Sequence, residues 1–169
     1  MMGTMNDRPP SPALPRRHWL RWGATGTWAL LTLRPLAAQT TASDNTPERL
    51  ALRAAVRAWT GGVEPRRGRV TIDIAPLVEN GNSVPVTLGV DSPMSAADHV
   101  TALALFNERN PQREVIVAHF TPANGLAQLA TRIRLATSQT LTAVARTSDG
   151  SFWSRDVEVI VTLAACIES

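Results

Sequence analysis

The chain has one cysteine, Cys166, close to its C-terminus, and it contains no lysine and no tyrosine. A single cysteine excludes an internal disulfide framework, which small exported domains often use. Histidine is scarce as well, since only three are present, and no glycine-rich loop is placed to cradle a phosphate. These absences leave few residues that could form a metal site or a catalytic centre.

The first 38 residues are expected to form an export signal. Residues 16–21 read Arg-Arg-His-Trp-Leu-Arg, and a weakly apolar stretch follows over residues 23–33. This order is typical of a twin-arginine (Tat) signal. The apolar stretch is about 11 residues long, too short for a membrane anchor that needs about 20. We predict periplasmic localisation, cleavage after Ala38 and a linker over residues 39–45.

Removal of the leader changes the charge of the protein. The whole chain has a net charge of +3, but five of its 17 arginines and only one of its 14 acids precede residue 39. The exported chain therefore carries 12 arginines against 13 acids, a formal charge of −1. A near-neutral chain lacks the basic footprint of nucleic-acid-binding proteins. Neither nucleic acid nor a membrane is an expected partner.

The exported domain is expected to span residues 46–169. One helix is predicted at its start. Thr46 is suited to cap it, Pro47 fits its first position, and Gly61-Gly62 ends it. An apolar stripe at helical spacing predicts that the helix packs on the core, with an arginine face exposed to solvent. The stripe is Leu52, Ala55, Val56 and Trp59, and the arginines are Arg49, Arg53 and Arg57.

From residue 69 onward, apolar and polar residues alternate between turn signals. Asn80-Gly81-Asn82 predicts a turn and Ser148-Asp149-Gly150-Ser151 a hairpin. Seven short segments at regular spacing predict an all-β fold, an immunoglobulin-like antiparallel β-sandwich with one N-terminal helix. The segments are residues 70–74, 84–90, 100–106 (helix or strand), 114–120, 129–135, 141–146 and 157–163.

The exported domain shows no catalytic constellation. His119 lies within a predicted strand and His99 at a loop edge, where structural roles are more common than ligand roles. A thiol enzyme that pairs Cys166 with either histidine is disfavoured, because a chain end holds a nucleophile poorly. We expect no metal, no cofactor and no catalytic residue. The lone thiol is then either a chance residue or a chemical handle.

Six ordered runs in this domain carry a resemblance to a known family. They are Pro76–Val86, Val90–Met94, Asn110–Gln112, His119–Gly125, Thr131–Ala136 and Ser148–Trp153. Together they resemble SoxY, the sulfur-carrier subunit of the periplasmic SoxYZ complex of thiosulfate oxidation, over roughly residues 46–166. The resemblance implies a heterodimer with a SoxZ-like subunit and separate sulfur-oxidation enzymes of the Sox type. It also implies that Cys166 is the site of covalent sulfur attachment.

The chain departs from the family in its C-terminal arm. The family arm reads Gly-Gly-Cys-Gly-Gly, whereas residues 164–169 read Ala-Ala-Cys-Ile-Glu-Ser. Alanine and isoleucine restrict the backbone more than glycine does. Glu168 and the terminal carboxylate are expected to raise the pKa of the thiol above its reference of about 8.5.

The expected reach of the arm is short. If the last strand ends near Leu163, Cys166 extends only about 10 Å beyond it. The alternative to a carrier is a SoxY-like binding or partner module without carrier activity, which would not need the thiol.

Overall fold

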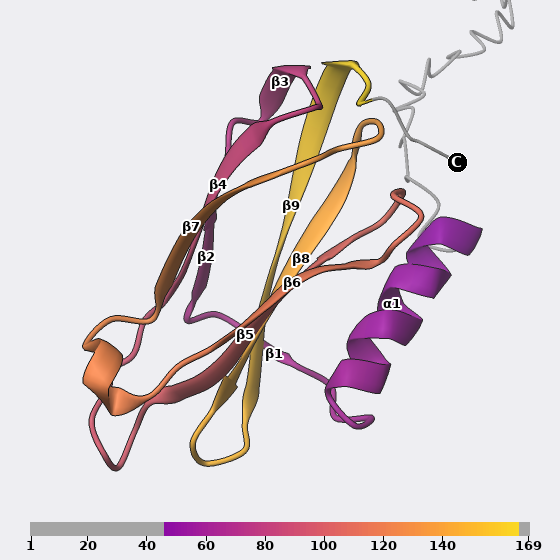
Figure 1. Ribbon diagram of the computed structural model, residues 1–169. Coiled ribbons are helices and arrows are strands. Elements are labelled where there is room, and N and C mark those ends of the chain that lie inside the picture. The colour runs from indigo at the N-terminus through magenta and orange to yellow at the C-terminus, as the bar shows by residue number, and fades with distance from the viewer. Residues whose placement is uncertain (1–45, 166–169) are drawn as a thin grey trace, which may run out of the picture. The chain divides into compact units, whose positions relative to one another are not determined.

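The computed structural model describes residues 46–165 (Figure 1). The predicted leader, the linker and Cys166 lie outside these described residues. The described chain folds into one α-helix, nine β-strands and a short 3₁₀ turn. Their bounds are α1 Pro47–Trp59, β1 Arg66–Arg67, β2 Val70–Asp73, β3 Leu77–Asn80, β4 Val84–Val90, β5 Val100–Asn107, β6 Glu114–His119, η1 Pro122–Asn124, β7 Gln128–Ile133, β8 Gln139–Thr147 and β9 Phe152–Leu163.

Helix α1 begins and ends where its sequence predicts. The Thr46 hydroxyl accepts a hydrogen bond from the Arg49 N–H at 3.3 Å, which satisfies one of the open donors of the first turn. After Trp59 the backbone turns through Gly61 and Gly62, whose φ angles of 65° and 90° favour glycine. No helix within residues 46–165 is long and apolar enough to cross a membrane.

The strands form two sheets. The larger sheet has the order β1-β9-β8-β5-β6, with β3 also paired to β9, and the smaller has the order β2-β4-β7. Figure 1 shows the two sheets as layers, with α1 on the outer side of the larger one. This arrangement confirms the predicted β-sandwich with one N-terminal helix. The apolar residues 100–106, open to helix or strand from the sequence, form strand β5.

Two pairings in the larger sheet are parallel, although the sequence predicts an antiparallel sandwich throughout. Arg66 of β1 lies opposite Trp153 near the start of β9, and Leu77 of β3 lies opposite Ile160 near its end. The chain crosses to the smaller sheet in between, because β2 pairs with β4. Strand β9 is therefore flanked by β8 on one side and by β1 and β3 on the other.

Alternating residues of the larger sheet face two separate cores. One face of β5, including Leu103 and Leu105, packs between the sheets. The opposite face, including Ala104 and Phe106, packs against α1. Burial on both faces accounts for the nearly continuous apolar run of β5, which alternation alone could not assign.

The β8–β9 hairpin turns at Gly150, which has a φ of 82°. The Asp149 carboxylate accepts hydrogen bonds from the Thr147 hydroxyl at 2.6 Å and the Ser151 N–H at 3.0 Å. These bonds, that of Thr147 foremost, lower the pKa of Asp149 from 3.8 to about 2. The turn chemistry predicted from Ser148–Ser151 is confirmed.

Candidate functional site at the end of strand β9

Strand β9 ends at Leu163, as the sequence predicts. Ala164 is exposed, whereas Ala165 is buried and is the last described residue. Cys166, the predicted attachment site, follows directly and lies outside the described residues. The site is therefore described from the two residues that precede Cys166 and from the segments that hold them.

Three backbone hydrogen bonds hold this end of the chain in a clasp formed by Gly81, Leu135, Leu163 and Ala165. Gly81 N–H donates to Leu163 C=O at 2.8 Å, and Leu135 N–H donates to Gly81 C=O at 2.8 Å. Ala165 N–H in turn donates to Leu135 C=O at 3.1 Å. The β3–β4 turn and the β7–β8 loop thus bind the chain on both sides of Ala164.

The clasp changes the reach expected for Cys166. The sequence places the last anchored residue near Leu163 and the thiol about 10 Å beyond it. In the structure the chain is anchored through Ala165, and consecutive Cα atoms are only about 3.8 Å apart. The last described anchor of the chain is therefore Ala165, two residues later than the sequence predicts.

Gly81 is required in the clasp because of close packing. A Cβ atom at this position would lie 2.3 Å from the Leu135 oxygen and 3.0 Å from the Ala165 nitrogen. Neither backbone atom can rotate away, so no other residue fits without moving the loop or the tail. The sequence explains Asn80-Gly81-Asn82 as a turn, and the Asn82 N–H does donate to Asn80 Oδ1 at 2.9 Å. The packing role of Gly81 was missed.

The side chain of Asn110 fixes Leu135 from the β5–β6 loop. Its Nδ2 donates to Arg134 C=O at 2.8 Å, and its Oδ1 accepts from Ala136 N–H at 3.0 Å. Asn110 therefore bonds to the backbone on either side of Leu135. Oδ1 also accepts from Gln139 Nε2 at 2.7 Å, which ties the same loop to the start of β8.

Two exposed arginines lie next to these contacts. Arg134 directly precedes Leu135, and Arg109 directly precedes Asn110. The Arg109 N–H donates to Gln139 Oε1 at 2.8 Å, so its backbone is fixed as well. The segments that carry both guanidinium groups are thus bonded to the network that holds Ala165.

Arg49 of α1 and Glu108 of the β5–β6 loop form a largely buried ion pair. This pair shows that one prediction about the helix is wrong. Arg49 was predicted to face solvent, but only 20% of its side chain is exposed, and its Nε lies 3.7 Å from Glu108 Oε1. Burial acts to raise the pKa of Glu108, but hydrogen bonds from Thr140 and the charges of Arg49 and Arg109 outweigh it and lower that pKa. Helix α1 is thereby fastened to β8 and to the β5–β6 loop.

A groove of about 770 Å³ runs between α1 and the outer face of β9. Two ion pairs lie among the charged side chains that line it. Arg67 NH2 lies 3.0 Å from Asp156 Oδ2, and Arg49 NH2 lies 3.7 Å from Glu158 Oε1. The first pair joins β1 to β9 within the sheet, and the second joins α1 to β9.

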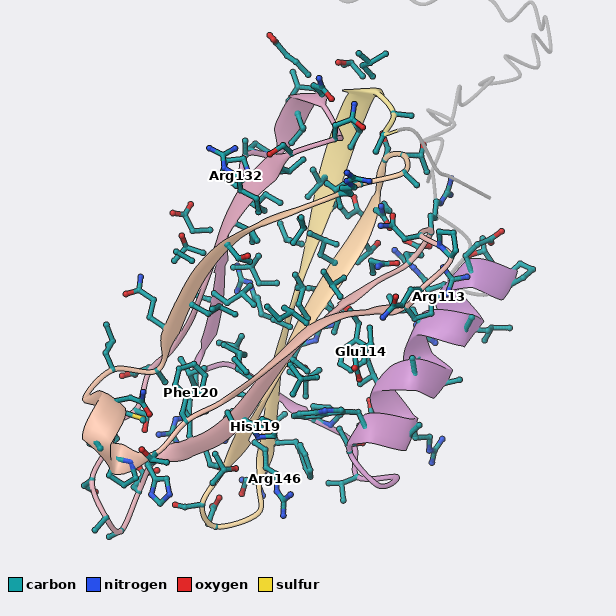
Figure 2. The ribbon with its side chains drawn as sticks, viewed as in Figure 1. Arg113, Glu114, His119, Phe120, Arg132 and Arg146 are labelled. Carbon is teal, nitrogen blue, oxygen red and sulfur yellow. The ribbon has the colours of Figure 1, made fainter. Side chains whose placement is uncertain are left out.

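The two histidines of the domain lie away from the clasp. His119 is exposed at the end of β6, paired opposite Ala102, near the sandwich end opposite the clasp (Figure 2). His99 precedes β5, and its Nδ1 lies 3.0 Å from the Ser95 oxygen. Within residues 46–165 no three His, Cys, Asp or Glu side chains gather to form a possible metal site.

The fold and the clasp define a β-sandwich domain that anchors a short, cysteine-bearing C-terminal tail. Among solved structures it is similar to the sulfur carrier protein SoxY from Chlorobium limicola f thiosulfatophilum, with a TM-score of 0.58 and 23% identity over 68% of this chain and 94% of that one. It is also similar to a superoxide reductase (neelaredoxin) from Ignicoccus hospitalis, with a TM-score of 0.50 and 19% identity over 64% and 86%. These likenesses show the fold. No match was found among curated proteins.

The family profile of "Sulfur oxidation protein SoxY" matches residues 36–166, which is most of the chain. The chain therefore belongs to the SoxY family, as its sequence runs indicate. The match extends through Cys166. Three of the runs that carry the resemblance supply the clasp and its support: Pro76–Val86 with Gly81, Asn110–Gln112 with Asn110, and Thr131–Ala136 with Leu135.

Proposed function

We propose that the protein is a periplasmic, non-catalytic sulfur carrier that holds sulfur-oxidation intermediates covalently on Cys166. Membership of the SoxY family supports a carrier role in sulfur oxidation. The observation that carries the assignment to Cys166 is the clasp, which anchors the chain up to the residue before the thiol. In this proposal the thiol belongs to the residue that directly follows a fixed point of the backbone, Ala165.

The loading step forms one sulfur–sulfur bond. The thiol R–SH and thiosulfate, S₂O₃²⁻, give R–S–S–SO₃⁻, one proton and two electrons. The electrons pass to a separate electron-accepting redox enzyme, because the residues near the clasp supply no acceptor. The carrier then contributes a thiol, a fixed position and a surface, while enzymes of the Sox type contribute the chemistry.

The partner and the compartment are part of the same proposal. A SoxZ-like subunit is proposed as the heterodimer partner, since the family resemblance implies it. Periplasmic localisation by the Tat pathway is proposed from the twin arginine at residues 16–17. Affinity purification of the exported protein is expected to recover a SoxZ-like subunit at equal stoichiometry, and recovery of the chain alone would contradict the heterodimer.

Intact-mass analysis tests the carrier role. The protein is purified from cells that oxidise thiosulfate and from cells grown without reduced sulfur. In the first sample we expect mass increases of added sulfur atoms or a sulfonate group, reversible by reductant and absent from Cys166→Ser. If the protein carries only glutathione or no adduct in both samples, the carrier role is wrong.

One observation favours a second candidate, a partner module without carrier activity. The residue before the thiol is alanine and is buried and hydrogen-bonded, which limits the excursion of the tail. One experiment distinguishes the carrier from the partner module. Thiosulfate oxidation by cells with Cys166→Ser fails if the protein is a carrier and persists if the protein is a partner module.

A further inference from the structure

Strand β6 is an open edge of the larger sheet. It pairs with β5 on one side, and among residues 46–165 no strand pairs with its other side. Its four central residues, 115–118, are all apolar and partly exposed, and its titratable side chains are confined to its two ends. Natural sheet edges usually carry a charge or a proline within the strand, which prevents pairing with another chain. Strand β6 lacks this protection over its central residues.

The other strands at the sheet edges are less suited to such pairing. Strands β1, β2 and β3 have only two, four and four residues. Strand β7 is as long as β6, but Arg132 lies within it and is exposed. Strand β6 is therefore the longest edge strand of the described domain without an internal charge.

The open side of β6 presents the backbone groups of Val117 and His119. The Phe120 N–H donates to the Thr101 C=O of β5 at 3.1 Å, so it points into the sheet. In an antiparallel pair, successive residues of a strand direct their N–H and C=O groups to alternate sides. The groups of His119 and Val117 therefore point away from β5, toward the open edge.

Glu114 and His119 lie symmetrically about Val117. Along the pairing with β5, His119 lies two positions beyond Val117 and Glu114 two positions before it, because a β-bulge takes up one residue of β6. The three side chains therefore share one face of the sheet, the face that also packs α1. Glu114 and His119 are exposed, and neither forms an ion pair within residues 46–165. Figure 2 shows them at the two ends of the strand.

We propose that β6 pairs antiparallel with β6 of a second copy of this chain, about a two-fold axis at Val117. This pairing places the two copies of Val117 opposite each other, and it places His119 of each copy opposite Glu114 of the other. An imidazole donates a hydrogen bond to a carboxylate when neutral and forms an ion pair with it when protonated. The charges at the two ends of β6 thus make the strand complementary to itself in the antiparallel direction. The inference goes beyond the proposed carrier function and does not depend on it.

The test measures the dissociation constant of the dimer by sedimentation equilibrium of the purified exported protein. Reductant is present, so that Cys166, the only cysteine, cannot link two copies by a disulfide. The wild type is compared with Val117→Pro, Glu114→Lys, His119→Glu and the double variant Glu114→Lys with His119→Glu. Glu79→Lys, the same charge change at an exposed position of β3, is the control.

Val117→Pro should leave a folded monomer, because it removes an N–H that points away from β5, and circular dichroism checks the fold. Glu114→Lys and His119→Glu each remove both complementary pairs of the dimer, so each should raise the dissociation constant about ten-fold. The double variant should return it to within about two-fold of the wild type, since the charges are complementary again.

Glu79→Lys should leave the dissociation constant unchanged. A wild type that stays monomeric would overturn the pairing. So would a double variant as weak as the single ones, because the effect of the charges would then not depend on their being opposite each other.

The SoxZ-like subunit is the other candidate for this edge, and one further measurement separates the two. Affinity purification of the exported Val117→Pro variant should recover that subunit as the wild type does. Loss of its recovery would assign the edge of β6 to the heterodimer and overturn the pairing of two copies. Intact-mass analysis of Cys166 adducts tests the carrier role independently of either result.

Discussion

Gly81 controls the base of the tail through backbone geometry. Its N–H and C=O join Leu163 to Leu135, and Leu135 in turn holds Ala165. The residue itself offers no chemistry. Its missing side chain lets three segments that are distant in sequence approach within hydrogen-bonding distance of one another, so a substitution here acts on the position of Ala165.

Gly81→Ala is expected to open the clasp and destabilise the protein. The added methyl group would lie 2.3 Å from the Leu135 oxygen, and overpacking of this kind costs about 1–3 kcal/mol. Urea unfolding should show the lost stability, and amide exchange at Ala165 should become faster. Gly89→Ala is the control, because its Cβ would meet only the rotatable Thr71 hydroxyl at 2.7 Å. Unchanged exchange at Ala165 in Gly81→Ala would contradict the role of the clasp.

The candidate site could be predicted only in part from sequence. A resemblance points to Cys166 and to the runs that contain Gly81, Asn110 and Leu135. It does not show that these runs meet, because their contacts are backbone hydrogen bonds between loops far apart in the chain.

The amphipathic pattern of α1 predicts which face packs on the core, but it does not predict the ion pair of the opposite face. The apolar stripe docks as expected, and Trp59 contacts Phe106 and Phe152 in edge-to-face geometry, with ring centroids 6.3 and 5.7 Å apart. Arg49 departs from the prediction because a buried carboxylate lies opposite it. The sequence assigns Arg49 to solvent because it does not show that Glu108, 59 residues later, lies opposite it in the fold.

Leu52→Ala is expected to loosen the helix from the sheet. Leu52 is 4% exposed and packs with the second core cluster, and truncation of a buried leucine costs about 2–5 kcal/mol. Thermal unfolding followed by circular dichroism measures the effect. Leu50→Ala, which truncates the same side chain where it is 51% exposed, should have almost no effect. Equal losses in both variants would show that the helix is not docked by this stripe.

The strands differ in how well the sequence predicts them. Strand β4 was predicted with its observed bounds, because one face is buried and the residues alternate strictly. Strands β1 and β3 were missed, since they are short and mostly exposed and depend on parallel pairing with β9. Such strands exist because the longest strand offers them an edge, which is a tertiary property.

At the scale of the whole molecule, the compartment decides whether the proposed chemistry is available. A covalent sulfur adduct on an exposed thiol persists where reducing systems are absent. The proposed leader of residues 1–38 and the proposed sulfur chemistry on Cys166 are therefore linked, although they belong to opposite ends of the chain.

Replacement of the twin arginine by lysine, R16K with R17K, is expected to abolish export. Tat signals depend on the arginine pair, and lysine keeps the charge but not the motif. Cell fractionation should find the variant in the cytoplasm at its full length, with Arg8→Lys exported as in the wild type. Export of the double variant would exclude the Tat pathway as the route.

Strand β9 also determines how the protein responds to mechanical load. In the proposed function, an enzyme that withdraws cargo would load the C-terminal end of β9, a twelve-residue strand that pairs with β8 over its first eight residues and with β3 near its end. Rupture by such a pull requires many hydrogen bonds to shear together, whereas a hairpin pulled apart sideways opens one bond at a time. A pull on this end is therefore expected to load the three bonds of the clasp and the β3 pairing before the longer β8 pairing.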